Sequence, residues 1–180
     1  MYFDIRCQNS TPEVLFHGIK EFIIEAKNAG IKLIVCSSSS SVKVMQKNTG
    51  LLPYMDYIVD TSKGSIDCIT PNAIKNNKIP GKPAPDLFEV GFMRAKELLP
   101  NLKKEEVLGF EDATNGIAAI KGAGIDALYI GDINHPSNIT AFKNFNVHPD
   151  YVIEHSSQLT LSKINQLINE KEEDSSLSLS

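Results

Sequence analysis

The chain has 180 residues, of which 42% are hydrophobic and 22% are charged, as expected for a single globular domain. Its net charge of −4, without a basic block, argues against nucleic acid or an anionic membrane surface as a partner. No stretch approaches the length of a membrane span. The three cysteines are odd in number and form no CxxC pair, so we expect reduced thiols in a cytoplasmic protein.

The first half of the chain predicts helices alternating with strands. Apolar residues recur every three or four positions between residues 18 and 29, which is the spacing of an amphipathic helix. A nearly continuous apolar run then predicts a buried strand. The elements predicted before residue 81 are, in order, a helix over 18–29, a strand over 31–36, a serine run over 37–41, a short helix over 42–47, a strand over 57–59 and a long loop over 61–80.

The second half continues this alternation. A segment with two prolines opens a helix with a clear apolar face. The predicted elements are a helix over 82–99, a strand over 107–110, a short helix over 117–121, strands over 127–130 and 151–153, a helix over 159–168 and a frayed tail over 171–180. Strands that alternate with helices predict an α/β fold with a Rossmann-like, doubly wound parallel sheet. The sequence shows no internal repeat.

The strand over 107–110 ends abruptly in two adjacent carboxylates, Glu111 and Asp112. In open α/β sheets, ligands bind beyond the carboxyl ends of the strands. Two adjacent carboxylates repel each other unless a cation lies against them, and oxygen ligands favour Mg²⁺. The residues are equally consistent with a simpler arrangement, in which Asp112 caps the next helix and Glu111 is solvated.

Two further polar groups follow strands or their loops: Ser37, which opens the serine run, and Lys82. Because parallel strands end at one edge of a sheet, we expect these groups to meet Glu111 and Asp112 there. A hydroxyl, a lysine and a metal-binding carboxylate pair together describe a site for a phosphoryl group. Taken alone, the serine run favours a flexible helix-capping linker. Lys82 taken alone favours an ordinary surface lysine, as most lysines are, although the prolines beside it hold its segment stiffly and weaken that interpretation.

With these residues in view, the chain resembles the haloacid dehalogenase superfamily, and within it the β-phosphoglucomutase-like phosphatases and mutases. Three segments carry the resemblance, namely Val35-Cys36-Ser37-Ser38-Ser39-Ser40, Gly81-Lys82-Pro83-Ala84-Pro85-Asp86 and Gly109-Phe110-Glu111-Asp112-Ala113-Thr114-Asn115-Gly116-Ile117. They resemble the second, third and fourth motifs of that family. The resemblance implies that Ser37, Ser38 and Lys82 bind phosphate, with Ser37 and Lys82 acting in catalysis. It also implies that Glu111 and Asp112 hold Mg²⁺.

The first motif of the family, a short apolar strand that ends in Asp-x-Asp-Gly, has no counterpart in this sequence. In the family, its first Asp is the nucleophile and its second Asp is the general acid and base. Here Asp4 follows two aromatic residues, but Arg6 stands where the second Asp belongs. Relatives also place a helical cap domain between the first and second motifs, and the missing strand lies at the centre of their sheet.

These observations predict an N-terminally incomplete haloacid dehalogenase-like core. We expect residues 1–10 to be a remnant of the cap or disordered, residues 11–169 to form the core, and residues 170–180 to be disordered. The parent protein would be a Mg²⁺-dependent phosphatase or phosphomutase of a small phosphorylated metabolite. The chain itself would be part of a longer enzyme and inactive. The alternative is a non-catalytic module that binds phosphate or a phosphosugar. The oligomeric state is open, although an uncovered sheet edge would favour self-association.

Overall fold

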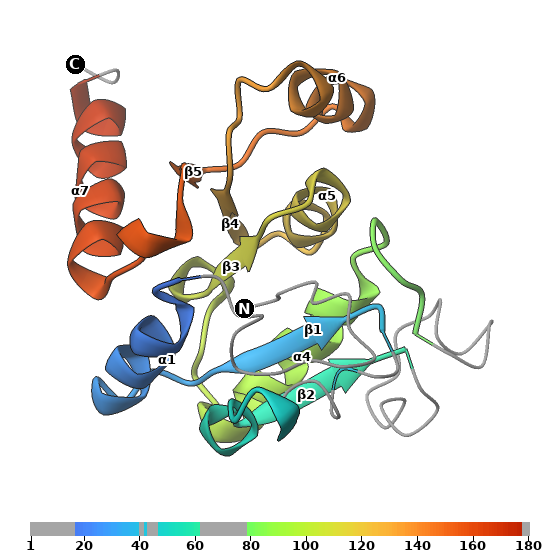
Figure 1. Ribbon diagram of the computed structural model, residues 1–180, viewed down its shortest axis with the longest axis vertical. Coiled ribbons are helices and arrows are strands. Elements are labelled where there is room, and N and C mark those ends of the chain that lie inside the picture. The colour runs from blue at the N-terminus through green and yellow to red at the C-terminus, as the bar shows by residue number, and fades with distance from the viewer. Residues whose placement is uncertain (1–16, 40–41, 43–46, 62–78, 178–180) are drawn as a thin grey trace.

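The computed structural model describes residues 17–39, 42, 47–61 and 79–177. These residues form a layered α/β fold in which helices lie on both sides of parallel strands (Figure 1). The α-helices are α1 (Ile19–Asn28), α4 (Asp86–Leu98), α5 (Thr114–Gly122), α6 (Pro136–Phe145) and α7 (Leu161–Leu177). The strands are β1 (Ile34–Ser37), β2 (Tyr57–Asp60), β3 (Leu108–Glu111), β4 (Asp126–Ile130) and β5 (Tyr151–Ile153). The predicted α/β class with parallel strands is confirmed.

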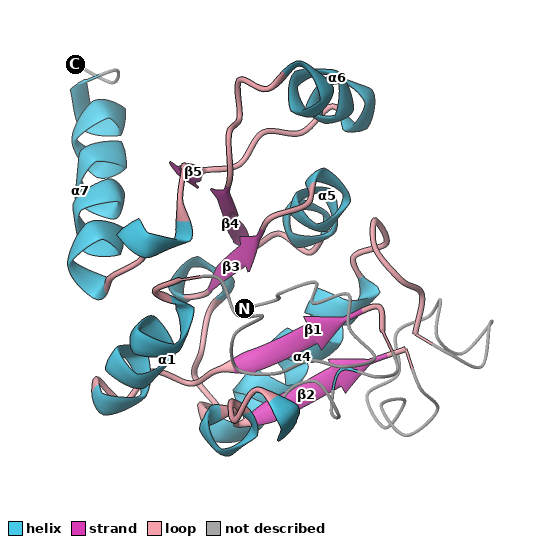
Figure 2. Ribbon diagram, in the orientation of Figure 1, coloured by secondary structure: helices cyan, strands magenta, loops and turns pink. Residues whose placement is uncertain are grey.

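The strands form two parallel sheets, one with the order β1-β2 and the other with the order β3-β4-β5 (Figure 2). Within the described residues, no strand joins β1 to β3. The family resemblance predicts the strand of the first motif at this position, at the centre of the sheet between the strands of the second and fourth motifs. Asp4 and the rest of the predicted cap remnant lie outside the described residues.

Two apolar clusters fill the core, one on each side of the strands. The cluster on one side joins β1, β2 and β4 to α4, α5 and α6. The other joins β3, β4 and β5 to α1 and α7. Alternation along β4 supplies both clusters, because Ala127 and Tyr129 belong to the first and Leu128 belongs to the second. Each cluster contains residues from both sheets or from the segments beside them, so the two sheets pack against the same helices.

The amino-terminal edges of the two sheets carry the same set of contacts. Before β2, Asp56 accepts hydrogen bonds from Lys27 Nζ at 2.7 Å and from the Leu33 amide at 2.8 Å. Before β5, Asp150 accepts hydrogen bonds from Lys121 Nζ at 2.6 Å and from Ala127 N–H at 2.8 Å. The lysine lies 29 residues, and the amide donor 23 residues, before the aspartate in both cases. The fold therefore repeats a contact that the sequence alone did not reveal.

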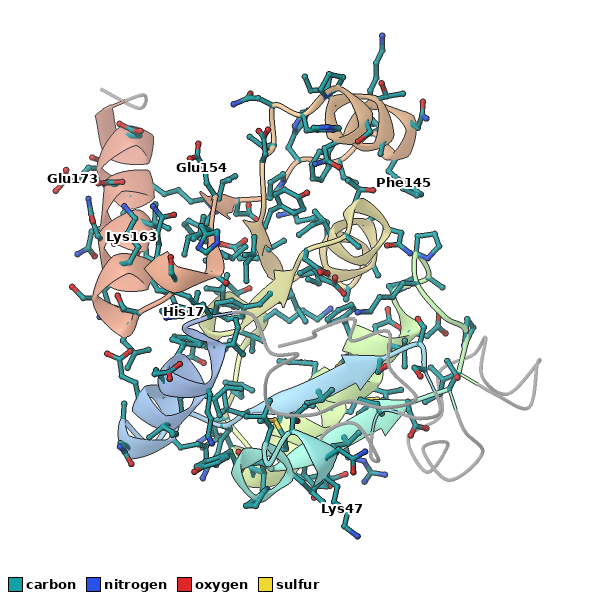
Figure 3. The ribbon with its side chains drawn as sticks, viewed as in Figure 1. His17, Lys47, Phe145, Glu154, Lys163 and Glu173 are labelled. Atoms are coloured by element: carbon teal, nitrogen blue, oxygen red, sulfur yellow. The ribbon has the colours of Figure 1, made fainter. Side chains whose placement is uncertain are left out.

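The last helix is longer than predicted. It extends from Leu161 to Leu177, through most of the segment that the sequence predicts to be a disordered tail. Lys171 explains this extension, because its Nζ lies 2.9 Å from a carboxylate oxygen of Asp126 and 3.0 Å from one of Asp150. His17 lies just before α1, at the start of the described residues (Figure 3). Its carbonyl oxygen accepts a hydrogen bond from the Ser156 hydroxyl at 2.9 Å.

Other elements differ from the prediction in their limits. Helix α5 begins at Thr114, three residues before the predicted start. Helix α6 was not predicted, although Pro136 in its first turn and Asn146 in a left-handed conformation at its end are typical helix boundaries. The short helix predicted over 42–47 and the loop over 61–80 lie mostly outside the described residues. No helix in the described part of the chain is long and apolar enough to cross a membrane.

We expect Asp150→Asn to destabilise the protein more than Asp56→Asn. Both variants weaken an aspartate–lysine–amide contact, but Asp150 also binds Lys171 and so holds α7. A hydrogen bond to a charged group contributes about 1.5–3 kcal/mol, so we expect losses of about 3 kcal/mol for Asp150→Asn and about 1.5 kcal/mol for Asp56→Asn. Urea unfolding measures both, and equal losses would contradict the role assigned to Lys171.

Acid should also weaken the contacts of Asp150 and so destabilise the protein. Burial opposes the ionised form of Asp150, but the bonds from Lys121, Ala127 and Lys171 outweigh it and lower its pKa below the ordinary value of 3.8. The stability that this group contributes is therefore present above about pH 4 and is lost as the pH falls through the lowered pKa.

Candidate active site

The strands that carry the predicted site residues end on the same side of the fold. Ser37 is the last residue of β1 and is paired in register with Asp60, the last residue of β2. Glu111 is the last residue of β3. All three side chains are buried. The segment that contains Lys82 lies between Ile79 and the start of α4, and it reaches both β1 and β3. Residues from three distant parts of the sequence are thus brought into contact.

Lys82 and Glu111 form a buried ion pair. The Lys82 ammonium donates to Glu111 Oε1, and the side chains are only 4% and 0% exposed. The Lys82 Nζ also lies 5.0 Å from the centre of the Phe88 ring, a cation–π contact that covers the ammonium from the side of α4. Two of the simpler alternatives are therefore wrong: Lys82 is not a surface lysine, and Glu111 is not solvated.

The first turn of α5 encloses the Glu111 side chain. The amide of Ala113 donates to Glu111 Oε2 at 3.4 Å. Gly116 lies so close that a Cβ atom at this position would overlap the Glu111 carboxyl group. The positive end of the α5 dipole also favours a carboxylate here. Ala113, not Asp112, is the N-cap residue of α5, so the alternative in which Asp112 caps this helix is wrong.

Burial shifts the acid–base equilibria of both partners. It raises the pKa of Glu111 from 4.5 to about 7, although the charge of Lys82 favours the carboxylate. Burial also lowers the pKa of Lys82, against the influence of Glu111 and Asp112. Each group thus depends on its partner to stay charged within the protein.

The turn after β1 supplies hydroxyl groups beside Lys82. Ser37 is 1% exposed, and its Oγ accepts a hydrogen bond from the Ser39 amide at 3.0 Å. The exposed Ser38 accepts a hydrogen bond through its Oγ from the Lys82 amide at 3.1 Å. Its carbonyl oxygen accepts another from the Thr61 hydroxyl at 3.2 Å. Hydroxyls and main-chain amides just beyond the end of a parallel strand suit an anion.

Asp112 follows Glu111 and is partly exposed. Its negative charge favours the protonated form of both Lys82 and Glu111 and so acts to raise both pKa values, as expected of a carboxylate close to the ion pair. Within the described residues, no group of three or more His, Cys, Asp or Glu side chains is arranged to hold a metal. This donor set still fits Mg²⁺, which usually binds one or two carboxylates and completes its shell with water and phosphate oxygens.

The structure places Lys82 in contact with Glu111 and Ser38, and it places Ser37 on the same turn as Ser38. The sequence did not predict that Glu111 pairs with Lys82. It also gave no role to Gly81 or Gly116, although both belong to the segments that carry the family resemblance. The role of Gly116 could have been inferred from its position, because it lies five residues after Glu111 and in the first turn of the helix that packs over this buried carboxylate.

A family model for haloacid dehalogenase-like hydrolases matches residues 4–124, and the chain therefore belongs to this family. The curated proteins to which it is similar include β-phosphoglucomutases. It is 28% identical over 156 residues to the β-phosphoglucomutase of Bacillus subtilis, covering 87% of this chain and 56% of that protein. It is 32% identical over 117 residues to the β-phosphoglucomutase of Mycobacterium tuberculosis, covering 65% of this chain and 38% of that protein. The chain spans about half the length of these relatives, or less.

Solved structures have the same fold. The β-phosphoglucomutase of Clostridium difficile matches with a TM-score of 0.66 and 22% identity, covering 89% of this chain and 59% of that chain. CbbY from Rhodobacter sphaeroides, solved in complex with phosphate, matches with a TM-score of 0.58 and 22% identity, covering 82% of this chain and 57% of that chain. The predicted family and fold are confirmed.

Proposed function

We propose that Ser37, Ser38 and Lys82 bind the phosphoryl group of a small phosphorylated metabolite. The observation that carries this proposal is the buried Lys82–Glu111 pair beside the hydroxyl-rich turn after β1. A lysine that is held in place by a buried carboxylate needs no reordering to meet a phosphate oxygen, so its conformational entropy is already lost. The hydroxyls and amides of the turn add hydrogen bonds that favour an anion over a neutral ligand.

Asp112 would hold Mg²⁺, with help from Glu111. Because Glu111 Oε1 is paired with Lys82 and Glu111 Oε2 accepts from the Ala113 amide, Asp112 is the better placed of the two carboxylates to face a metal. Bound there, Mg²⁺ would neutralise charge on the phosphoryl group. Lys82 would hold a phosphoryl oxygen, and the Ser37 and Ser38 hydroxyls would orient the others.

The family and its relatives suggest the class of reaction, which is phosphoryl transfer by a phosphatase or phosphomutase of the cytoplasm. CbbY from Rhodobacter sphaeroides was solved with xylulose-1,5-bisphosphate, which supports a sugar phosphate as the ligand class here. The sequence nevertheless contains no Asp-x-Asp pair. We therefore expect this chain to bind phosphate without appreciable turnover. The same absence supports the second candidate, a non-catalytic phosphate-binding module.

Hydrolysis of p-nitrophenyl phosphate tests the expected lack of turnover. We expect no Mg²⁺-dependent release of p-nitrophenol above the rate in buffer. The proposed site would bind a phosphoryl group through Ser37, Ser38 and Lys82, but the sequence lacks the Asp-x-Asp motif that supplies the nucleophile in the family. Asp112→Asn is the control, since it removes the main metal ligand. Mg²⁺-dependent hydrolysis that disappears in Asp112→Asn would contradict the expectation and would point to a nucleophile elsewhere in the chain.

A further inference from the structure

We propose that Ser38 is a positioning residue, whose hydroxyl fixes the main chain at Lys82 and thereby holds the Lys82 side chain in the phosphate site. The functional part of this inference rests on the proposed function. The contact that carries it is the hydrogen bond from the Lys82 amide to Ser38 Oγ, 3.1 Å long, between residues 44 positions apart in the sequence. It joins the turn after β1 to the segment that precedes α4.

The donors and acceptors around Ser38 support this role. Its Oγ accepts from the Lys82 amide, and its carbonyl oxygen accepts from the Thr61 hydroxyl. Three segments therefore meet at one residue: the end of β1, the end of β2 and the approach to α4. Since a hydroxyl that accepts through a lone pair keeps its own proton, Ser38 retains a donor for a phosphoryl oxygen. One side chain can thus fix Lys82 and contact the ligand.

Gly81 gives an independent indication that the two segments must approach closely. A Cβ atom at Gly81 would lie 3.2 Å from Ser38 Oγ and 3.5 Å from Ser38 Cβ. The first distance is tight for a carbon–oxygen contact, whereas the second is ordinary van der Waals contact. A Cβ atom at position 81 would thus require the Ser38 side chain to shift by a few tenths of an ångström, and removal of the Ser38 hydroxyl would relieve this contact.

Lys82 is consequently held at two points. Ser38 fixes its main chain, and Glu111 fixes the end of its side chain. An ion pair alone leaves the segment between these points free to adopt several conformations. The second attachment limits the positions that the ammonium can reach, which lowers the entropy lost when a phosphate binds.

Hydrogen exchange at the Lys82 amide, followed at residue resolution by NMR, tests the contact directly. Loss of one hydrogen bond should raise its exchange rate about five- to tenfold in Ser38→Ala. Ser38→Thr keeps the hydroxyl and should retain the slow exchange. Thr61→Val is the matched control, because it removes a hydroxyl from the same site but spares Ser38 Oγ. An unchanged Lys82 rate in Ser38→Ala would overturn the proposal.

The affinity for inorganic phosphate, measured in the same variants by calorimetry, tests the consequence. Ser38→Ala and Gly81→Ala should each weaken binding about fivefold or more, and the double variant should be no weaker than Ser38→Ala alone. Additive losses, or undiminished binding in Ser38→Ala despite faster Lys82 exchange, would overturn the positioning role. If the wild-type chain binds no phosphate but Lys82 exchange still rises in Ser38→Ala, the contact is upheld and the proposed function fails.

Discussion

Lys82→Met should abolish phosphate binding and lower the free energy of unfolding by about 3 kcal/mol at pH 8. The loss of stability follows because removing one member of a buried ion pair leaves the other as an uncompensated charge. Glu111 is 0% exposed, so water cannot replace the missing ammonium. Lys20→Met, at an exposed position on α1, is the control and should change the free energy of unfolding by less than about 0.5 kcal/mol.

The loss in Lys82→Met should depend on pH. Without the ammonium, the pKa of Glu111 should rise above its value of about 7, whereas in the unfolded chain this carboxyl has its ordinary pKa of 4.5. The folded protein then takes up a proton that the unfolded chain does not bind, so the stability of Lys82→Met should rise as the pH falls from 8 to 5. Adding Glu111→Gln should remove this pH dependence. A Lys82→Met variant as stable as the wild type at pH 8 would contradict the buried pair.

Gly116→Ala should destabilise the protein by about 3 kcal/mol, at the upper end of the usual loss from overpacking. The new Cβ atom would overlap the carboxyl group of Glu111, which cannot move because Lys82 and the first turn of α5 enclose it. Displacement of Glu111 should also shift Lys82, so phosphate binding should weaken as well. Urea unfolding and calorimetry measure the two effects.

The control for this prediction lies in the same helix. A Cβ atom at Gly122 would lie 3.3 Å from the Pro85 side chain, so Gly122→Ala should cause a far smaller loss. In a Glu111→Ala background, Gly116→Ala should have little effect, because the atoms that it would overlap are gone. A similar loss from Gly116→Ala with and without the Glu111 side chain would show that the tight contact lies elsewhere.

The sequence predicted the strands well because their signal is local. The apolar run before Glu111 and the run before Ser37 each end in the predicted polar residue, and both strands are parallel as expected. The limits of the last helix could not be predicted in the same way. Lys171 reads as one charge in a polar tail, and its two aspartate partners lie 45 and 21 residues away.

In the candidate site, too, the positions of the residues could be predicted from the sequence, but their contacts could not. Motif spacing placed Ser37, Lys82 and the two carboxylates at one edge, which is a consequence of parallel topology. The partner of each group depends on side-chain packing. Glu111 turns beneath α5 and meets Lys82 because Gly116 leaves room for it, and no pattern of hydrophobic residues encodes that choice. The amide contact between Ser38 and Lys82 likewise depends on two loops folding against each other.

The most direct test of the shared site is the coupling between phosphate and Mg²⁺, measured by calorimetric titration of phosphate in the absence and presence of the metal. If Ser37, Lys82 and Asp112 face one phosphoryl group, Mg²⁺ should tighten phosphate binding, and phosphate should tighten Mg²⁺ binding by the same factor. Lys82→Met should abolish the binding of phosphate, and Asp112→Asn should abolish the coupling. Phosphate binding that is equal with and without Mg²⁺ in the wild-type chain would show that the two ligands do not share a site.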